Sequence, residues 1–463
     1  MKLIYNVKDK PKFGQMLVFA FQQLLAIMAA TIAVPGMVGN GMTASAALFG
    51  AGAGTIIYQL FTRFRSPVFL GSSFAFIAPM AAAFSGAVTL GVAETSLGYL
   101  GLLIGALLAG LVYVVIALTV KFAGVNWIAK LMPPVVIGPT VALIGLTLAN
   151  AAINDVFLWT PKNENSAFTM TTTLWITLLC ALVTLVVVIL CSVYGKRMAK
   201  LIPFIIGILS GYAVALVFTI IGTVTKNPEL LIIDFAPFKE LAPDGQIALS
   251  TFLSVPEFTF IKAFEGIQHF EWSYVLTIAV AYIPVAFVVF AEHIADHKNL
   301  SSIIESDLLE EPGLHNTLLG DGVGSIVGAF FGGCPNTTYG ESVGCVAITR
   351  NASVVTITTT AIMAMLVSFI SPFVAFLDSI PGCVMGGVCI TLYGFIAVSG
   401  LKMIQKVDLE QNANLFTVAA ILIPGIGGMA LTIGKVTITT TACALILGIL
   451  VNLMVNKARK NNN

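Results

Sequence analysis

Long apolar runs recur along almost the whole chain and restrict its possible folds more than any other feature. They follow one another between short polar stretches, and runs of about 18 or more apolar residues span a bilayer as helices. Only 10% of the 463 residues are charged, whereas soluble domains carry about 25%. The sequence therefore predicts an all-α polytopic membrane protein. Its net charge of +1 offers no basic surface for nucleic acid.

Most of the apolar runs are predicted to cross the membrane as continuous helices. These are residues 14–34, 44–62, 98–120, 132–152, 172–194, 202–222, 273–295, 314–332, 353–372, 380–401, 413–430 and 436–456. Two further segments, 68–86 and 334–349, contain glycine, proline and polar residues, and each is long enough to cross only if part of it is extended chain. Counting both gives fourteen transmembrane segments.

The positions of the basic residues support this count. With the N-terminus inside, the only Lys and Arg residues of the 23 to face outside are Lys162, Lys226, Lys239, Lys262 and Lys435. Membrane proteins concentrate basic residues in cytoplasmic loops, and the bias disappears here if either interrupted segment is left out. The sequence thus predicts a multi-pass protein of the cell membrane with both termini in the cytoplasm.

The two interrupted segments hold matching places, third and tenth, in two sets of seven. An odd number of crossings in each half puts the halves in opposite orientations. Inverted repeats with interrupted helices near the bilayer midplane are typical of secondary transporters and mark their binding site. We therefore expect a 7+7 inverted repeat in which segments 3 and 10 are each part strand and part half-helix.

Acidic residues inside predicted spans are candidates for chemistry, because each costs at least about 2.5 kcal/mol at a helix centre. Glu341 lies in the second interrupted segment, and Glu292 lies in "FAEHIADHKNL" at the cytoplasmic half of a continuous helix. Glu292 and Asp296 are four residues apart and share a helix face. Two stacked carboxylates repel each other unless one is protonated, so this pair could carry a proton.

Two other interpretations of this stretch stay open. The helix could end at the cytoplasmic interface, with Asp296, His297 and Lys298 in solvent. His293 and His297 are also spaced as in a zinc-binding helix. A metal site would need a third ligand, and nothing else in the sequence obviously supplies one.

The interrupted segments predict a pocket near the middle of the membrane. Extended chain cannot satisfy its own backbone in lipid, so both segments must be buried in protein or line a cavity. We expect them to pair and then begin half-helices near Ala75 and Glu341, whose first N–H groups point into the cavity. With Phe74 and Tyr339 as walls, the pocket suits a small planar ligand with alternating N–H and C=O groups. The alternative is that glycine and proline only kink packed helices.

At these residues the sequence resembles a known family. "GCPNTTYGESVGCVAITR" (333–350) is similar to the signature of the nucleobase–ascorbate transporter family, also called nucleobase:cation symporter-2. That signature begins with an acid or Gln, followed by Asn, any residue and Gly; after four further residues come Thr and a basic residue. The corresponding residues in this sequence are Glu341, Ser342, Val343, Gly344, Thr349 and Arg350. The similarity extends to "FLGSSFAFIAP", "AEHI", "DLLEEPGLH" and "VMGGVCITLYG", and Glu341 is typical of the bacterial uracil permease branch.

The resemblance implies a proton-coupled uracil symporter, which is not an enzyme, needs no cofactor and works as a homodimer in the bilayer. It also implies a core domain that moves like an elevator against a gate domain. In this sequence the core would comprise 1–130 and 273–372, and the gate would comprise 131–272 and 373–463.

The resemblance further implies roles for particular residues. Glu292 and Glu341 would hold the N–H groups of the base, while backbone N–H groups at Phe74 and Gly340 would meet its carbonyls. Residues expected to pack nearby or to support these from behind are Ala30, Tyr339, Tyr393, Ser342, His293 and Gln23. Glu292, Asp296 and Glu341 are the candidates for proton coupling.

The chain also departs from the family pattern. Ser342 replaces the signature's Asn, Gln22–Gln23 replaces a Gln–His pair, and Asp296 stands where related permeases can have His. The first two departures should alter hydrogen bonds around the site, and the third bears on which group holds the proton. Three alternative functions are a purine symporter for xanthine or uric acid, an anion exchanger of similar fold and a membrane metallohydrolase.

Overall fold

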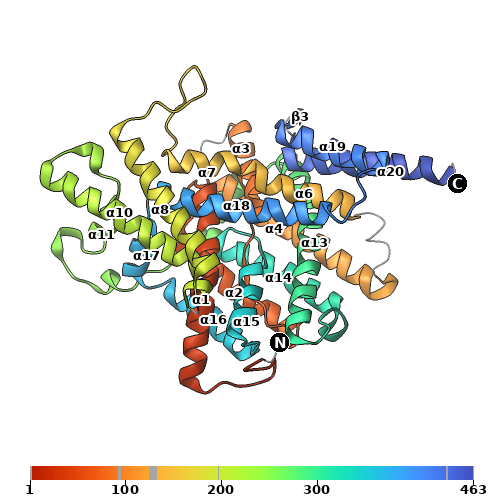
Figure 1. The fold of residues 1–463 in the computed structure, drawn as a ribbon, viewed down its shortest axis with the longest axis horizontal. Helices are drawn as coiled ribbons and strands as arrows, with labels where there is room; N and C mark the ends of the chain where they lie inside the picture. The colour runs from red at the N-terminus through yellow and green to blue at the C-terminus, as the bar shows by residue number, and fades with distance from the viewer. Residues whose placement is uncertain (1–2, 92–94, 125–132, 197, 434–435, 462–463) are drawn as a thin grey trace.

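The computed structural model describes residues 3–91, 95–124, 133–196, 198–433 and 436–461 (Figure 1). The predicted external Lys435 lies outside them. Within the described residues, eight helices are long and apolar enough to cross a membrane, and four shorter apolar helices accompany them. The expectation of a mostly helical, multi-pass membrane protein is therefore confirmed.

The described residues of the first half are mostly helical and include one short strand. Its elements are α1 (Phe13–Val38), α2 (Ala44–Phe61), β1 (Leu70–Ser72), the 3-10 turn η1 (Phe74–Phe76), α3 (Ile77–Thr89), α4 (Ser96–Ala123), α6 (Pro134–Thr147), α7 (Ala149–Val156), α8 (Thr172–Tyr194), α9 (Met198–Leu201) and α10 (Pro203–Thr225). A long connection follows, with η2 (Pro228–Leu230), α11 (Ala236–Lys239), η3 (Pro243–Gly245), η4 (Leu249–Thr251), α12 (Thr259–Glu265) and η5 (Gly266–His269).

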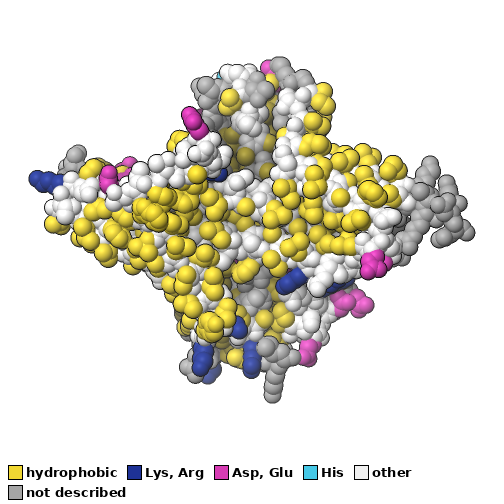
Figure 2. Space-filling model, turned by 45° about the horizontal axis from the view of Figure 1, so that its top comes forward, with side chains coloured by type: hydrophobic (Ala, Val, Ile, Leu, Met, Phe, Trp, Pro, Cys, Tyr) yellow, Lys and Arg dark blue, Asp and Glu magenta, His cyan; other side chains and the backbone are white. Residues whose placement is uncertain are grey.

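The second half is also mostly helical, and its described residues include three short strands. Its elements are α13 (Trp272–Ile304), the turn η6 (Leu309–Gly313), α14 (Leu314–Gly332), β2 (Asn336–Thr338), α15 (Gly340–Thr349), α16 (Val354–Val367), α17 (Ser371–Asp378), α18 (Gly382–Ile404), α19 (Asn412–Ile426), β3 (Leu431–Ile433), β4 (Val436–Ile438) and α20 (Thr440–Asn461). Figure 2 shows hydrophobic side chains across the broad middle of one face, with charged side chains mainly towards its margins.

Glycine lets α2 and α14 approach closely near the centre of the molecule. A Cβ atom at Gly50 or Gly54 would collide with the backbone of Gly328 or Gly324. Asn336 of β2 lies in the same place and donates from Nδ2 to the Gly50 carbonyl at 3.0 Å. This contact fixes the position of β2 against α2.

The structure corrects the predicted end of one helix. The segment expected at 273–295 continues as α13 to Ile304, so His297 lies inside a helix. His297 is 1% exposed and contacts Tyr58 of α2. The interpretation that places His297 in solvent at a helix end is wrong, because neighbouring helices cover this turn of α13.

Candidate functional site

A cavity of about 380 Å³ lies where the two short strands meet the long helices. One side of the cavity is formed by η1, β2, α13 and the start of α15. The facing side is formed by α6, α10 and α18. The sequence-predicted residues that line it are Phe74, Glu292, Asp296, Tyr339, Gly340 and Glu341. The structure thus brings together side chains from distant parts of the chain around one cavity.

The strands that carry this cavity pair with each other. β1 and β2 are antiparallel, with Leu70 opposite Thr338 and Ser72 opposite Asn336. Tyr339 then folds back: its hydroxyl donates to the Ser72 carbonyl at 2.7 Å, and a Cβ at Gly71 would collide with its ring. Each strand therefore satisfies its backbone against the other, as extended chain inside a membrane must.

Each strand is followed directly by a helical turn that begins in the cavity wall. η1 begins at Phe74 and α15 begins at Gly340. The first N–H groups of a helix have no acceptor within it, and they carry the positive end of the helix dipole. Both helix starts can therefore donate hydrogen bonds to a ligand in the cavity.

Three carboxylates face these donors. Glu292 and Asp296 lie one turn apart on α13, and Glu341 lies in the first turn of α15. Thr338 Oγ1 donates to Asp296 Oδ2 at 2.8 Å, which fixes that carboxylate beside β2. The cavity therefore combines carboxylate acceptors with backbone N–H donors, and Phe74 and Tyr339 add aromatic surface.

A second polar cluster lies behind Glu292 and outside the cavity lining. His293 Nδ1 lies 2.7 Å from Asp321 Oδ2, and His293 Nε2 lies 3.0 Å from Thr317 Oγ1. The rings of His293 and His297 stack at 4.0 Å, and His297 Nε2 lies 2.6 Å from the Tyr58 hydroxyl. These contacts fix the rotation of α13 and so the direction of Glu292.

Asp321 was not among the residues predicted from the sequence. It is a buried carboxylate in α14, 1% exposed, inside an otherwise apolar run. An acid within a predicted span was an available signal. Among the residues described, no group of three or more His, Cys, Asp and Glu side chains is arranged to hold a metal ion.

Ser342, the position that departs from the family signature, joins three parts of the site. Its hydroxyl oxygen accepts a hydrogen bond from the Phe69 backbone N–H at 3.0 Å and one from Gln23 Nε2 at 2.5 Å. Ser342 is fully buried. A small hydroxyl therefore ties α1 and the start of β1 to the first turn of α15, next to Glu341.

Two residues that were expected to pack beside the ligand, Ala30 and Tyr393, do not line the cavity. Tyr393 lies behind Phe74, with the two rings edge to face at 5.8 Å. Ala30 is buried in a cluster with Tyr339. Both therefore support walls of the site.

Within a multi-pass helical fold, the cavity offers hydrogen-bond donors and acceptors to a ligand. Many apolar spans around one polar cavity are the architecture of a membrane transport protein. The chain belongs to the Permease family (Xan_ur_permease), whose sequence profile matches residues 14–434.

Curated relatives match almost the entire chain. It is 38% identical over 456 residues to a uracil permease of Bacillus caldolyticus, covering 98% of this chain and 95% of that protein. It is 36% identical to the uracil permease of Bacillus subtilis, covering 99% and 97%. It is 34% identical to the uracil permease of Escherichia coli, covering 97% and 93%.

Solved structures share the fold at low sequence identity. The transmembrane domain of the cyanobacterial bicarbonate transporter BicA superposes with a TM-score of 0.59 at 15% identity, covering 97% of this chain and all of that one. Murine Slc26a9, an anion transporter in an inward-facing state, gives 0.63 at 13% identity, covering 98% of this chain and 69% of that one. At these identities the similarity concerns the fold alone.

Proposed function

We propose that this protein moves uracil across the cell membrane together with protons. The observation that carries the proposal is the cavity in which Glu292 and Glu341 face the helix starts at Phe74 and Gly340. The names of relatives that are 34–38% identical over nearly the whole chain support uracil as the ligand.

The chemistry of uracil fits this arrangement of groups. The ring has two N–H donors and two carbonyl acceptors in one plane. Glu292 and Glu341 accept the N–H groups, and the backbone N–H groups at Phe74 and Gly340 donate to the carbonyls. Hydrogen bonds to a carboxylate are about twice as strong as those between neutral groups, so the two acids supply most of the polar affinity.

Proton coupling follows from the number of acids. Glu292, Asp296 and Glu341 share one cavity, and three ionised carboxylates at this depth repel each other. A proton bound to one of them lowers this repulsion. Glu292 is the leading carrier because it lies one turn from Asp296 and also contacts the ligand.

The transport cycle we propose is an elevator movement of the core (1–130 and 273–372) against the gate (131–272 and 373–463). The fourteen segments would then form a 7+7 inverted repeat with both termini in the cytoplasm, assembled as a homodimer. The cavity supports this division, because the interrupted segments and α13 form one wall and α6 and α18 form the other. Ser399 and Met403, near the end of α18 that this topology puts towards the cytoplasm, are among its lining residues, which is consistent with an inward-facing state.

The test is uptake of labelled uracil by purified protein in liposomes, with unlabelled bases as competitors. We expect uracil to compete fully, and xanthine and uric acid to compete weakly at the same concentration. Stronger competition by xanthine would assign a purine as the substrate. Absence of uracil uptake, together with uptake of labelled bicarbonate by the same liposomes, would assign anion exchange.

A further inference from the structure

The long connection between α10 and α13 exposes many apolar side chains, although it contains no spanning helix. Trp272, at the start of α13, is 80% exposed, and Phe264 of α12 is 59% exposed. The other large exposed apolar residues described in the stretch are Leu231, Ile247, Leu249, Phe252, Leu253, Val255, Ile261, Ile267 and Phe270. An apolar set of this size in one segment is typical of an interaction surface.

The α12–η5 stretch has three different sides. Thr259, Ala263 and Gly266 are buried and face α4, where a Cβ at Gly266 would collide with the Ser96 backbone. Residues three apart on a helix are neighbours on its surface. Ile261, Phe264 and Ile267 therefore form one exposed flank, which we call the apolar flank.

The opposite flank of the same helix is polar. It carries Lys262 and the exposed Glu265, which are also three residues apart. Lys262 Nζ lies 2.6 Å from Glu257 Oε2 and 3.2 Å from the Gly41 carbonyl, and it contacts the Tyr99 hydroxyl at 3.5 Å. The helix therefore has one apolar side and one charged side, and the charged side adjoins α4 through the contact of Lys262 with Tyr99.

The apolar flank is continuous with the membrane-facing surface of the spanning helices. The ring centroids of Phe264 and Phe260 lie 6.3 Å apart, edge to face. The Phe260 ring stacks on Phe330, with 4.7 Å between the centroids and an interplanar angle of 7°. Phe330 lies near the end of α14 and is 37% exposed. Exposed apolar side chains also run along α4, to which α12 is attached: Leu107, Leu111, Val115 and Leu118.

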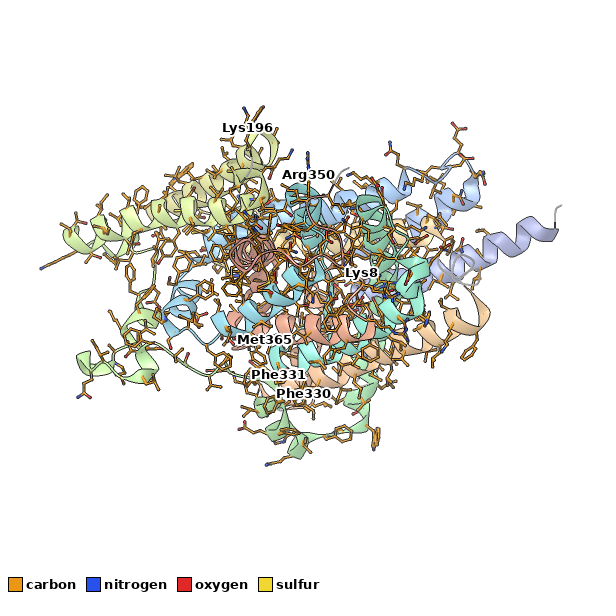
Figure 3. All side chains as sticks on the ribbon, turned by 90° about the horizontal axis from the view of Figure 1, so that it is seen from below. Lys8, Lys196, Phe330, Phe331, Arg350 and Met365 are labelled. Atoms are coloured by element: carbon orange, nitrogen blue, oxygen red, sulfur yellow. The ribbon has the colours of Figure 1, made fainter. Side chains whose placement is uncertain are left out.

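The same surface lies away from the predicted cytoplasmic side. Figure 3 shows Phe330 and Phe331 together on one side of the molecule, and Lys196 and Arg350 towards the opposite side. Tryptophan at the end of a spanning helix, as at Trp272, is typical of the membrane–water interface. An amphipathic helix in this position lies in the interface plane, with its apolar side towards the acyl chains.

We propose that α12 and η5 lie in the outer leaflet of the bilayer, with Ile261, Phe264 and Ile267 in contact with lipid and with Lys262 and Glu265 in the aqueous layer. The occupant of the apolar flank is then the lipid surface, not a second copy of the chain. A lipid-seated α12, packed on α4 and α14, attaches the outer end of these helices to the membrane plane.

Spin labels test this placement residue by residue. Single cysteines at Ile261, Phe264 and Ile267 carry a nitroxide in liposomes, and Glu265→Cys is the matched control on the same helix. The seven native cysteines are buried or half-buried, and unsubstituted protein gives the labelling background. We expect the first three labels to relax more with oxygen than with a water-soluble nickel chelate, and the Glu265 label to show the reverse.

Two results would overturn the proposal. Preferential relaxation by the nickel chelate at Phe264 would place the apolar flank in water. Exclusion of both reagents from all three positions would mean that protein covers the flank, as in an interface with a second copy.

A second measurement does not depend on cysteine variants. The fluorescence of Trp272 is the part of the tryptophan emission that disappears in Trp272→Phe. We expect lipids brominated near the headgroup to quench this part. Quenching of that emission by aqueous iodide alone would contradict a position in the leaflet.

Discussion

Replacing Glu341 by glutamine removes the charge from the first turn of α15 and keeps the size of the side chain. A hydrogen bond to a charged group contributes about 1.5–3 kcal/mol, and a neutral one about 0.5–1.5 kcal/mol. The expected loss of about 1–1.5 kcal/mol raises the Kd for uracil roughly tenfold. The effect is larger if the amide turns its NH₂ group towards the ligand N–H, because two donors then face each other.

Isothermal titration calorimetry of uracil into the purified variant measures this change. Glu310→Gln is the matched control, because it makes the same change of charge at an exposed residue that is not part of the cavity lining. The control should bind uracil with wild-type affinity. A Glu341→Gln protein with a Kd within twofold of wild type would refute the placement of this carboxylate against the ligand.

Three further changes probe the site. Gly340→Ala should fold, because the new methyl group meets only Asp296 Oδ1, at 3.9 Å, outside its own helix backbone and chain neighbours. It should weaken uracil binding roughly tenfold, because the methyl group blocks access to the backbone N–H of residue 340. Gly344→Ala, whose methyl group meets nothing within 4 Å, is the control and should bind uracil normally; equal affinities of the two variants would argue against the N–H of residue 340 as a donor. Ser342→Ala leaves the buried Phe69 N–H and Gln23 Nε2 without their acceptor, at a cost of about 1–3 kcal/mol each, so the midpoint of thermal unfolding should fall. Ser342→Thr keeps a hydroxyl and should retain most of the wild-type stability. An unchanged midpoint in the alanine variant would contradict the role of the hydroxyl. Glu292→Gln should abolish uracil accumulation driven by a pH gradient, and persistence of accumulation would move the proton to Asp296.

Length and hydropathy predict a continuous helix well where the apolar run ends at the same residue as the helix. The segments expected at 172–194 and 314–332 correspond to α8 and α14. Hydropathy fails where tertiary contacts decide. The run expected at 413–430 ends early, because α19 stops at Ile426 before the β3–β4 hairpin. The run expected at 132–152 is found as one span, Pro134–Val156, which consists of α6 and α7.

The candidate site also has residues that can be predicted from the sequence and contacts that cannot. Acids next to a helix breaker can be recognised in the sequence, which is why Glu341 and Glu292 stand out. The partners of Ser342 cannot be, because Phe69 and Gln23 are 273 and 319 residues away. Asp321 was visible as an acid in a span, but its pairing with His293 depends on how α13 packs on α14.

Uracil uptake into proteoliposomes with an imposed pH gradient tests the central claim most directly. With an acidic exterior, labelled uracil should accumulate above its outside concentration, and a protonophore should abolish the accumulation. Uptake that only equilibrates, at the same rate with and without the gradient, would contradict proton-coupled transport of uracil.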